Sequence, residues 1–400
     1  MSEIKKLIEK LCPDGVEYRK LGDIAKRLKG TPITAMLMKK IASEDGEIRV
    51  FAGGKTMINA HLEDIPNANI INEPALLVQS RGVIDFVYYD KPFTFKNEMW
   101  AYTLENPSSI KYVYYFLKAH VNYFRDKAVS MGAFPQISIP VTDNFEIPVP
   151  PLEVQSKIVE ILDNFTELEA ELEAELEARR KQYEYYRNQL LTFDKVGGAR
   201  FDVKWMRLGE FGKMIKGTGI QKSDFVENGY PCIHYGQLHT YFGTFADKNK
   251  SFICKSLYDK SKKAQYGDLL IATTSEDVEA CCKATAWLGD DVAVSGDAHI
   301  FHHNQNPKYI AYFFQTEDFA KQKRKYASGV KVVRVNSENL EKIIIPIPPL
   351  AEQERIVSIL DRFEDLTTDL QSGLPAEIEA RRKQYEYYRE KLLTFKRKTA

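Results

Sequence analysis

Eleven consecutive residues of this chain occur twice without a single change. The string Glu-Ala-Arg-Arg-Lys-Gln-Tyr-Glu-Tyr-Tyr-Arg spans residues 177–187 and again residues 379–389. Each copy lies in a longer repeated block, which opens with Ile-Pro-x-Pro-Pro-Leu (147–152 and 345–350), continues as Gln-x-x-Ile-Val-x-Ile-Leu-Asp and closes with Leu-Leu-Thr-Phe. Two copies of one block are expected to fold alike, so this repeat constrains the architecture more than any other feature.

A fainter repeat marks the head of each half of the chain. Lys-Gly-Thr occurs at residues 29–31 and again at 216–218, each time shortly after a Leu-Gly-acidic tripeptide. Between Lys-Gly-Thr and the Pro-rich entry the two halves share only scattered features. The sequence therefore predicts four segments: a first domain at 1–150, a helical spacer at 151–200, a second domain at 201–347 and a second helical spacer at 348–400.

Composition is that of a globular protein without a membrane span. Hydrophobic residues make up 44% and aromatic residues 12% of the 400 residues, and no apolar run reaches the ~18 residues that a span needs. The charged N-terminus lacks a signal-peptide core, so a cytoplasmic location is expected. Five cysteines, never spaced as Cys-x-x-Cys, argue against a disulfide framework and a zinc site.

The repeated blocks read as long helices. Residues 152–193 contain no glycine and no proline, and apolar or aromatic side chains recur every three or four positions, as in a coiled-coil seam. At ~1.5 Å per residue such a rod is about 60 Å long. We expect it to serve as a spacer or docking surface, not to fold back onto its own domain, and to pair antiparallel with the second copy. Gly373 and Pro375 should interrupt that second copy.

The two inserts differ from the helical blocks. Short apolar runs near residues 75–79, 84–89 and 268–274 are strand-like, and helical stretches follow at 110–125 and 307–326. Mixed α+β domains are the expected outcome. A basic run at 321–334 carries six positive charges and no negative one. A solvated helix face would explain it, but contact with DNA phosphates through Lys331 and Arg334 is the sharper hypothesis.

Searches for catalytic motifs give no active site. Gly53-Gly54-Lys55-Thr56 resembles the end of a phosphate-binding loop, but Arg49 stands where that pattern needs glycine. His299, His302 and His303 with Asp297 could line a metal site, although alternating histidines on a strand are more often hydrogen-bonded or at the surface. We therefore expect no catalytic, cofactor-binding or metal-binding residue in this chain.

The order of domain, Pro-Pro-Leu-x-x-Gln entry and long helix, repeated once, resembles the DNA-specificity subunit of type I restriction-modification systems. The resemblance covers essentially the whole chain, and its most specific part is the doubled block at 150–163 and 348–361. It implies an α+β fold with two pseudo-symmetric mixed α/β target-recognition domains, separated by two long helices that form an antiparallel coiled coil. Each domain would read one half of a bipartite DNA site.

The resemblance also implies partners and cofactors. The helices would dock two modification methyltransferase subunits, and through them the restriction (helicase-nuclease) subunits. S-adenosylmethionine, ATP and Mg²⁺ are expected on those partners and not on this chain, which would be non-catalytic. Two other classes stay open: a stand-alone two-domain DNA-binding regulator, which should carry a groove-reading helix-turn-helix, and a protein-only coiled-coil scaffold, which should have no affinity for DNA.

Site residues are predicted from their place in the repeat. Polar residues after strands or glycine turns are the candidates for contact with phosphates and base edges. In the first domain these are Lys29, Gly30, Thr31, Gln79, Ser80, Arg81, Lys127, Ser130 and Gln136, and in the second Lys216, Gly217, Thr218, Gln221, Lys222, Thr273, Thr274, Ser275, Lys331 and Arg334. The candidates for methyltransferase docking are Gln155, Tyr183, Tyr186, Arg187, Gln353, Tyr385, Tyr388 and Arg389. For the tyrosines, the alternative is that they pack helix against helix.

Overall fold

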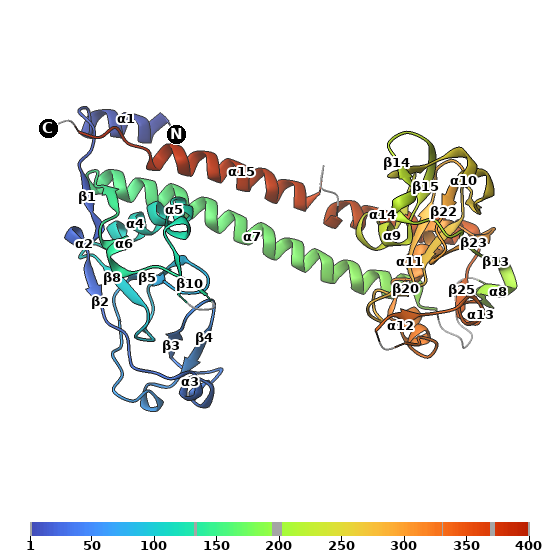
Figure 1. The fold of residues 1–400 in the computed structure, drawn as a ribbon, viewed down its shortest axis with the longest axis horizontal. Helices are drawn as coiled ribbons and strands as arrows, with labels where there is room; N and C mark the ends of the chain where they lie inside the picture. Colours follow the sequence, from blue (N-terminus) through green and yellow to red (C-terminus); the bar gives the residue numbers. More distant parts are fainter. Residues whose placement is uncertain (1, 132–133, 194–201, 330, 369–372, 399–400) are drawn as a thin grey trace. The chain divides into compact units, whose positions relative to one another are not determined.

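A computed structural model describes residues 2–131, 134–193, 202–329, 331–368 and 373–398 (Figure 1). The chain divides into two compact units: unit 1 comprises Met1–Glu173 and Glu377–Ala400, and unit 2 comprises Ala174–Ala376. Each unit therefore takes its helices from both repeated blocks. The first long helix, α7 (Leu152–Leu191), supplies residues to both units.

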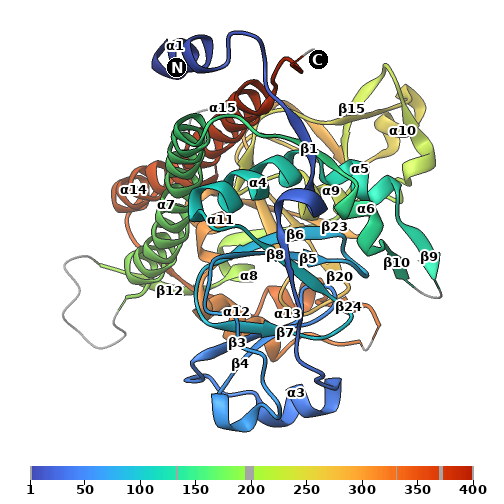
Figure 2. The ribbon, with the colours of Figure 1, turned by 90° about the vertical axis from the view of Figure 1, so that its left-hand side faces the viewer.

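Unit 1 has two main sheets, two two-stranded sheets (β1-β11 and β10-β9) and a helical layer. The order β2-β8-β5-β6 gives an antiparallel four-stranded sheet, while β4-β3-β7 gives a three-stranded one in which β3 and β7 are parallel. The three-stranded sheet and α3 lie away from α7 in both views (Figures 1 and 2). Besides α7, the elements of this unit are α1 (Ser2–Leu11), β1 (Tyr18–Lys20), α2 (Leu21–Ile24), β2 (Lys26–Leu28), α3 (Ala35–Ile41), β3 (Ile48–Phe51), β4 (Met57–Ala60), η1 (Leu62–Asp64), β5 (Ala75–Gln79), β6 (Asp85–Tyr89), β7 (Phe93–Phe95), β8 (Trp100–Thr103), α4 (Pro107–Ala119), α5 (Val121–Asp126), β9 (Val129–Met131), β10 (Phe134–Gln136), α6 (Ile139–Asp143), β11 (Glu146–Pro148) and α15 (Leu374–Leu393).

Unit 2 repeats this plan with larger sheets. Its first sheet has the order β13-β23-β19-β21-β16 and its second the order β14-β17-β15-β22-β18. Its elements are β12 (Lys204–Arg207), α8 (Leu208–Phe211), β13 (Gly212–Lys216), η2 (Lys222–Asp224), β14 (Phe225–Val226), β15 (Tyr230–Ile233), α9 (Tyr235–Thr240), β16 (Phe245–Ala246), β17 (Ser251–Ile253), α10 (Lys255–Lys260), β18 (Lys263–Ala264), β19 (Leu269–Ala272), β20 (Thr274–Ser275), β21 (Lys283–Trp287), β22 (Val292–Val294), β23 (Ala298–His303), α11 (Pro307–Phe313), α12 (Glu317–Arg324), β24 (Val333–Arg334), α13 (Ser337–Leu340), β25 (Ile344–Ile347) and α14 (Leu350–Thr368).

The predicted helix pairing is confirmed. In unit 1 the ring of Phe165 on α7 lies 6.2 Å from Tyr385 and 5.6 Å from Tyr388 on α15, while Arg382 pairs with Glu169 and Glu173. Numbers rise along one helix as they fall along the other, so the helices are antiparallel. Unit 2 repeats the aromatic contact: the ring of Phe363 lies 6.4 Å from Tyr183 and 5.6 Å from Tyr186.

An aspartate clamps each helical block onto its domain. In unit 1 the Asp163 carboxylate accepts hydrogen bonds from Lys111 Nζ (2.8 Å) and from the Tyr115 hydroxyl (2.5 Å). In unit 2 Asp361 does the same with Lys308 Nζ (2.9 Å) and the Tyr312 hydroxyl (2.7 Å). Both partners lie on the helix after the central sheet, so the duplicated block and part of each insert form one frame.

Most of the predicted elements are present, with one error. The first helix is continuous, and α14 ends at Thr368 before α15 begins at Leu374, with residues 369–372 outside the described part of the chain. Strands β5, β6 and β19 and helices α4, α5, α11 and α12 occupy the predicted ranges. The expectation that the first helix stays off its own domain is wrong, because Val154, Ile158 and Leu162 are fully buried in the core of unit 1.

Candidate nucleic-acid interface

The Lys-Gly-Thr segments support the fold from within. A Cβ on Gly30 would lie 2.1 Å from the Phe95 carbonyl oxygen, and one on Gly217 would lie 2.1 Å from that of Ser295. Thr31 is buried, and its hydroxyl is hydrogen-bonded to that of Thr94 at 2.6 Å. The predicted DNA contact of Thr31 is therefore corrected, because its side chain is fully buried. The missing Cβ of Gly30 and of Gly217 lets a neighbouring carbonyl oxygen approach closely, and the contact of these two glycines with DNA stays a prediction.

The residues that follow the central strands are also largely internal. Ser80 donates to the Glu98 carbonyl oxygen at 3.0 Å, and Thr273 is hydrogen-bonded to His299 at 3.1 Å. The side chains of these two residues and of Gln79 and Thr274 are buried. This corrects the predicted role of Ser80 as a DNA contact, because its side chain has no exposed surface. Gln79, Thr273 and Thr274 keep a small exposed surface, and their contact with DNA stays a prediction. They hold the loops on which their neighbours stand.

The other predicted DNA contacts lie at the surface or close to it. Thr218, half-buried, accepts the Lys262 amide at 2.8 Å, and Ser130 pairs with Pro135 in the β9–β10 hairpin, although its side chain lies outside the described residues. Gln136 and Ser275 are half-buried. The exposed predicted contacts are Lys29, Arg81, Lys127, Lys216, Gln221, Lys222, Lys331 and Arg334.

Unit 1 has a groove of about 520 Å³ that is lined by residues of α3, the turn between β3 and β4, the loops after β5 and β7, and β10. Cations Lys39, Arg81 and Lys96 line it, together with one acid, Glu98, which pairs with Lys96 at 2.8 Å. At its rim Phe134 is 55% exposed. A cationic groove with an exposed aromatic ring has the chemistry of a nucleic-acid surface.

Gly53, Gly54 and Thr56 of the Gly-Gly-Lys-Thr string line this groove. The string connects β3 to β4, and the Ala52 amide donates to the Thr56 carbonyl oxygen at 2.9 Å. A phosphate-binding loop joins a strand to a helix, so this strand-to-strand turn has the wrong context for a nucleotide site.

The histidines of unit 2 are used by the fold. His299 lies between the hydroxyls of Thr273 (3.1 Å) and Ser337 (2.7 Å), and His302 is paired with Asp268 at 2.6 Å. Burial lowers the pKa of His303 to about 4. Within the described ranges, no group of three or more potential metal ligands is found.

Two predicted docking residues are internal. Gln155 donates to the Pro150 carbonyl oxygen at 2.7 Å, and Gln353 donates to that of Pro348 at 2.8 Å. Both side chains are buried. The prediction that Gln155 and Gln353 dock a partner is therefore corrected: they fasten the start of each helix to its Pro-rich entry.

The other predicted docking residues belong to the helix seams. Tyr183 is buried, Tyr385 and Tyr388 are half-buried, and only Tyr186 is exposed, at 40%. The guanidinium of Arg187 lies 5.1 Å from the Tyr183 ring and that of Arg389 lies 5.3 Å from the Tyr385 ring. The helix-packing alternative therefore describes these six side chains better than a free docking surface does.

A different face of the repeat is exposed in both copies. Tyr185 is 60% exposed and its counterpart Tyr387 is 54% exposed. Beside each runs the same ion pair, Lys181 with Glu177 at 2.6 Å and Lys383 with Glu379 at 3.2 Å. These tyrosines lie outside the buried stripe that a three-and-four pattern identifies. Identical residues on the opposite stripe of both copies are the sequence signal that indicates them.

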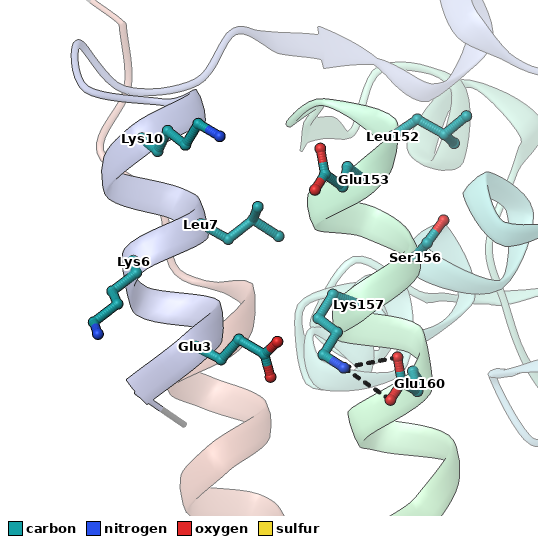
Figure 3. Close-up of a pocket in the computed structure, with 9 residues that line it drawn as sticks. All are labelled: Glu3, Lys6, Leu7, Lys10, Leu152, Glu153, Ser156, Lys157 and Glu160. Carbon is teal, nitrogen blue, oxygen red and sulfur yellow. Dashed lines mark hydrogen bonds and ion pairs between the residues drawn. The ribbon is translucent and has the colours of Figure 1, made fainter.

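The helix entries expose a second repeated apolar pair. Leu152 is 46% exposed and Leu350 is 53% exposed. Leu152 borders a groove of about 730 Å³ between α1 and α7 in unit 1 (Figure 3). Three acids and three lysines line this groove, and Lys157 is paired with Glu160 at 2.9 Å. Because its charges balance, this groove does not have the chemistry of a nucleic-acid surface. Its lining residues are Glu3, Lys6, Leu7, Lys10, Leu152, Glu153, Ser156, Lys157 and Glu160.

Comparison with known proteins gives one consistent result. The profile of the type I restriction modification DNA specificity domain matches residues 13–178 and 202–380. The chain is 33% identical to the type I restriction enzyme EcoR124I/EcoR124II specificity subunit of Escherichia coli, over 99% of this chain and 98% of the relative. It is 37% identical to a putative type I restriction enzyme specificity subunit of Haemophilus influenzae, over 62% and 63%.

Solved structures agree at the level of the fold. A type I restriction-modification S subunit from M. genitalium aligns with a TM-score of 0.57 and 16% identity over 95% of this chain and 96% of that one. A chain from a structure of the type I R-M system that addresses complex assembly and conformational transition aligns with a TM-score of 0.60 and 14% identity, over 96% and 98%.

Fold, repeat and comparisons together define a DNA-specificity protein with two target-recognition domains on a duplicated helical frame. The chain belongs to the specificity subunits of type I restriction-modification systems. None of the described helices combines the length and the apolar character that crossing a bilayer requires.

Proposed function

We propose that this chain reads a bipartite DNA target, with one half-site per domain, and docks two copies of a modification methyltransferase on the exposed face of its duplicated helix motif. Restriction subunits join through the methyltransferases. S-adenosylmethionine, ATP and Mg²⁺ are bound by those partners, and the chain itself is not catalytic. The complex works in the cytoplasm.

The observation that carries the proposal is that both units expose the same groups of the repeated helix. Tyr185 with its Lys181–Glu177 pair and Tyr387 with its Lys383–Glu379 pair present the same groups twice. One partner that meets two equivalent surfaces needs the same residues at both. An exposed aromatic ring beside charges that are already paired is typical of a protein interface.

The domains differ where DNA readout needs them to differ. The exposed cations lie on non-identical loops, such as Arg81 in unit 1 and Lys331 in unit 2. Two half-sites of different sequence require two different sets of base contacts. A protein-only scaffold would have no need of such cationic loops.

The docking proposal is tested by counting methyltransferases. The full chain is mixed with the methyltransferase from its own locus, and the complexes are weighed by native mass spectrometry. We expect two methyltransferases for the unaltered chain, one for Tyr185→Ala or Tyr387→Ala, and none for the double variant. Tyr266→Ala, at a tyrosine that is 74% exposed outside the repeat, is the matched control and should keep both. Two bound methyltransferases on the double variant would refute this docking face.

A further inference from the structure

Each domain has one arginine in an equivalent cross-strand residue pair. In unit 1 Arg81 is bridged antiparallel to Gln136, and in unit 2 Thr274 is paired antiparallel with Arg334. The neighbouring hydrogen bonds correspond: Ile137 N to Ser80 O at 2.9 Å, and Val335 N to Thr273 O at 3.2 Å. The same cross-strand pair thus carries its arginine on one strand in unit 1 and on the other in unit 2.

The fold fixes the backbone of both arginines. The Arg81 carbonyl oxygen accepts the Gly54 amide at 3.2 Å, and the next residue, Gly82, donates to the Pro135 carbonyl oxygen at 2.9 Å. The amide and carbonyl of Arg334 are both bonded to Ser328, at 2.9 and 3.1 Å. A donor on a fixed backbone is ready for a contact that requires a defined direction.

Neither guanidinium forms an ion pair with another described residue. Both arginines are exposed. The ion pairs found among the described residues of the first domain use Arg27, His61, Lys96, Lys111 and Lys118 as cations, and leave Arg81 out. Those of the second domain use Lys255, His302, Lys308, Lys321 and Arg324, and leave Arg334 out.

The apolar neighbours distinguish a base contact from a phosphate contact. Two positions before Gln136 stands Phe134, 55% exposed, and two positions before Arg334 stands Val332, 46% exposed. An exposed apolar side chain gains nothing from an anionic backbone, but it can lie against a thymine methyl group or a base step. Arginine beside such a side chain suits the edge of base pairs better than a phosphate.

We propose, resting on the DNA-reading function proposed above, that Arg81 reads a guanine in the first half-site and that Arg334 reads a guanine in the second. Each guanidinium donates two hydrogen bonds to the O6 and N7 atoms of its guanine. Phe134 and Val332 lie against the neighbouring base pair. This assigns Arg334 to a base edge, while Lys331 remains a predicted phosphate contact.

The test is selection from a pool of duplex DNA with randomised positions, using the complex of the full chain with its methyltransferase. Arg81→Ala should lower the preference for one G·C pair in the first half-site by roughly 10- to 100-fold and leave the second half-site unchanged. Arg334→Ala should do the reverse. The unaffected half-site reports that each variant is folded. Lys331→Ala, the control, should weaken binding to all sequences alike and reduce its salt dependence.

Two results would overturn the inference: an arginine variant that keeps every base preference, or one that weakens all sequences equally, as a phosphate contact would. Failure of the proposed function looks different, because the unaltered complex would then select no sequence at all.

Discussion

The frames of units 1 and 2 use the same contacts, whereas the domains they carry do not. Asp163 and Asp361 make matching bonds to a lysine and a tyrosine, and Phe165 and Phe363 meet matching tyrosine pairs. In the domains, the main sheets of unit 1 have four and three strands, whereas the main sheets of unit 2 have five strands each. Within this chain the two copies are therefore nearly identical over the helical frame and different over the domains that the frame carries.

One position inside the frame breaks the equivalence. Glu364 of unit 2 stands where unit 1 has Thr166. The Glu364 carboxylate accepts the Tyr312 hydroxyl at 2.7 Å and the Thr244 hydroxyl at 2.6 Å, whereas the Thr166 hydroxyl donates to the Leu162 carbonyl oxygen of its own helix at 3.0 Å. The clamp of unit 2 thus has two carboxylates and that of unit 1 has one. The two frames therefore share the aspartate contacts, but only unit 2 has a second carboxylate that accepts the tyrosine hydroxyl.

The largest effect is expected from lengthening the helix between the units. Inserting one Glu-Leu-Glu-Ala turn after Ala174 adds about 6 Å of helix and leaves the pairs of Arg382 with Glu169 and Glu173 untouched. We expect the gap between the half-sites to widen by about one to two base pairs, with the bases read unchanged. Sequencing of methylated DNA from cells that carry the variant measures both. Altered half-sites with an unaltered gap would contradict the spacer role.

A smaller effect, on stability, is expected from removing the clamp aspartates. Asp163→Ala leaves the Tyr115 hydroxyl without a carboxylate and should destabilise unit 1 by about 2 kcal/mol. Asp361→Ala should destabilise unit 2 by about half as much, because Glu364 still accepts the Tyr312 hydroxyl. The double variant Asp361→Ala/Glu364→Ala, which leaves the Tyr312 hydroxyl without either carboxylate acceptor, should remove that difference.

Thermal unfolding can be followed in each unit separately. Trp100 is buried in unit 1 and Trp287 in unit 2, so variants that keep only one of them as fluorophore report one unit each. Equal losses for the two aspartate variants, or a larger loss for Asp361→Ala, would show that Glu364 does not reinforce the clamp.

Acid should weaken unit 2 before unit 1. Burial lowers the pKa of His303 to about 4 and also lowers the pKa of His299 and of His234. A histidine whose folded pKa is lowered contributes stability above its unfolded pKa of about 6.5 and loses it as pH falls. In unit 1 the hydrogen bond that His61 Nδ1 donates to the Glu47 carboxylate raises the pKa of His61. The contribution of His61 to stability is therefore kept in acid and is lost only as pH rises through its folded pKa.

From pH 7 to pH 5 we therefore expect unit 2 to lose about 1–2 kcal/mol through His303, with little change in unit 1. The same two fluorescence reporters measure it. His303→Gln, which removes the histidine with the largest shift, should reduce the pH dependence of unit 2 and leave the part that is due to His299 and His234. A unit 2 that is insensitive to pH in the unaltered chain would contradict the burial of that imidazole.

The frame could be predicted from the sequence because its signals are local. A long stretch without glycine or proline specifies α7, and the repeat itself specifies that Tyr183 and Tyr385 have equivalent places. The loops could not be predicted in this way. Thr31 is buried because it meets Thr94, and Ser80 because it meets Glu98. Burial created by strand pairing over such distances leaves no signal at either position alone.

The same limit applies to the proposed docking face. A three-and-four pattern identifies the buried stripe of a helix, so it predicts Tyr183 and Tyr186 as contact residues and leaves out Tyr185. Only the structure separates the two stripes, by leaving Tyr185 and Tyr387 exposed in both copies. The correspondence between Arg81 and Arg334 could not be predicted from the repeat either. The two arginines belong to equivalent cross-strand pairs, but Arg81 lies on the first strand of its pair and Arg334 on the second strand of its own.

The most direct test of the division between frame and domain is to put the first domain on both frames. Residues 219–344 would be replaced by a copy of residues 32–146, which supplies Lys111 and Tyr115 to the clamp at Asp361. Target selection by the resulting methyltransferase complex should yield two copies of the first half-site, with two methyltransferases still bound. A target that retains the second half-site, or a chain that no longer binds two methyltransferases, would contradict the account.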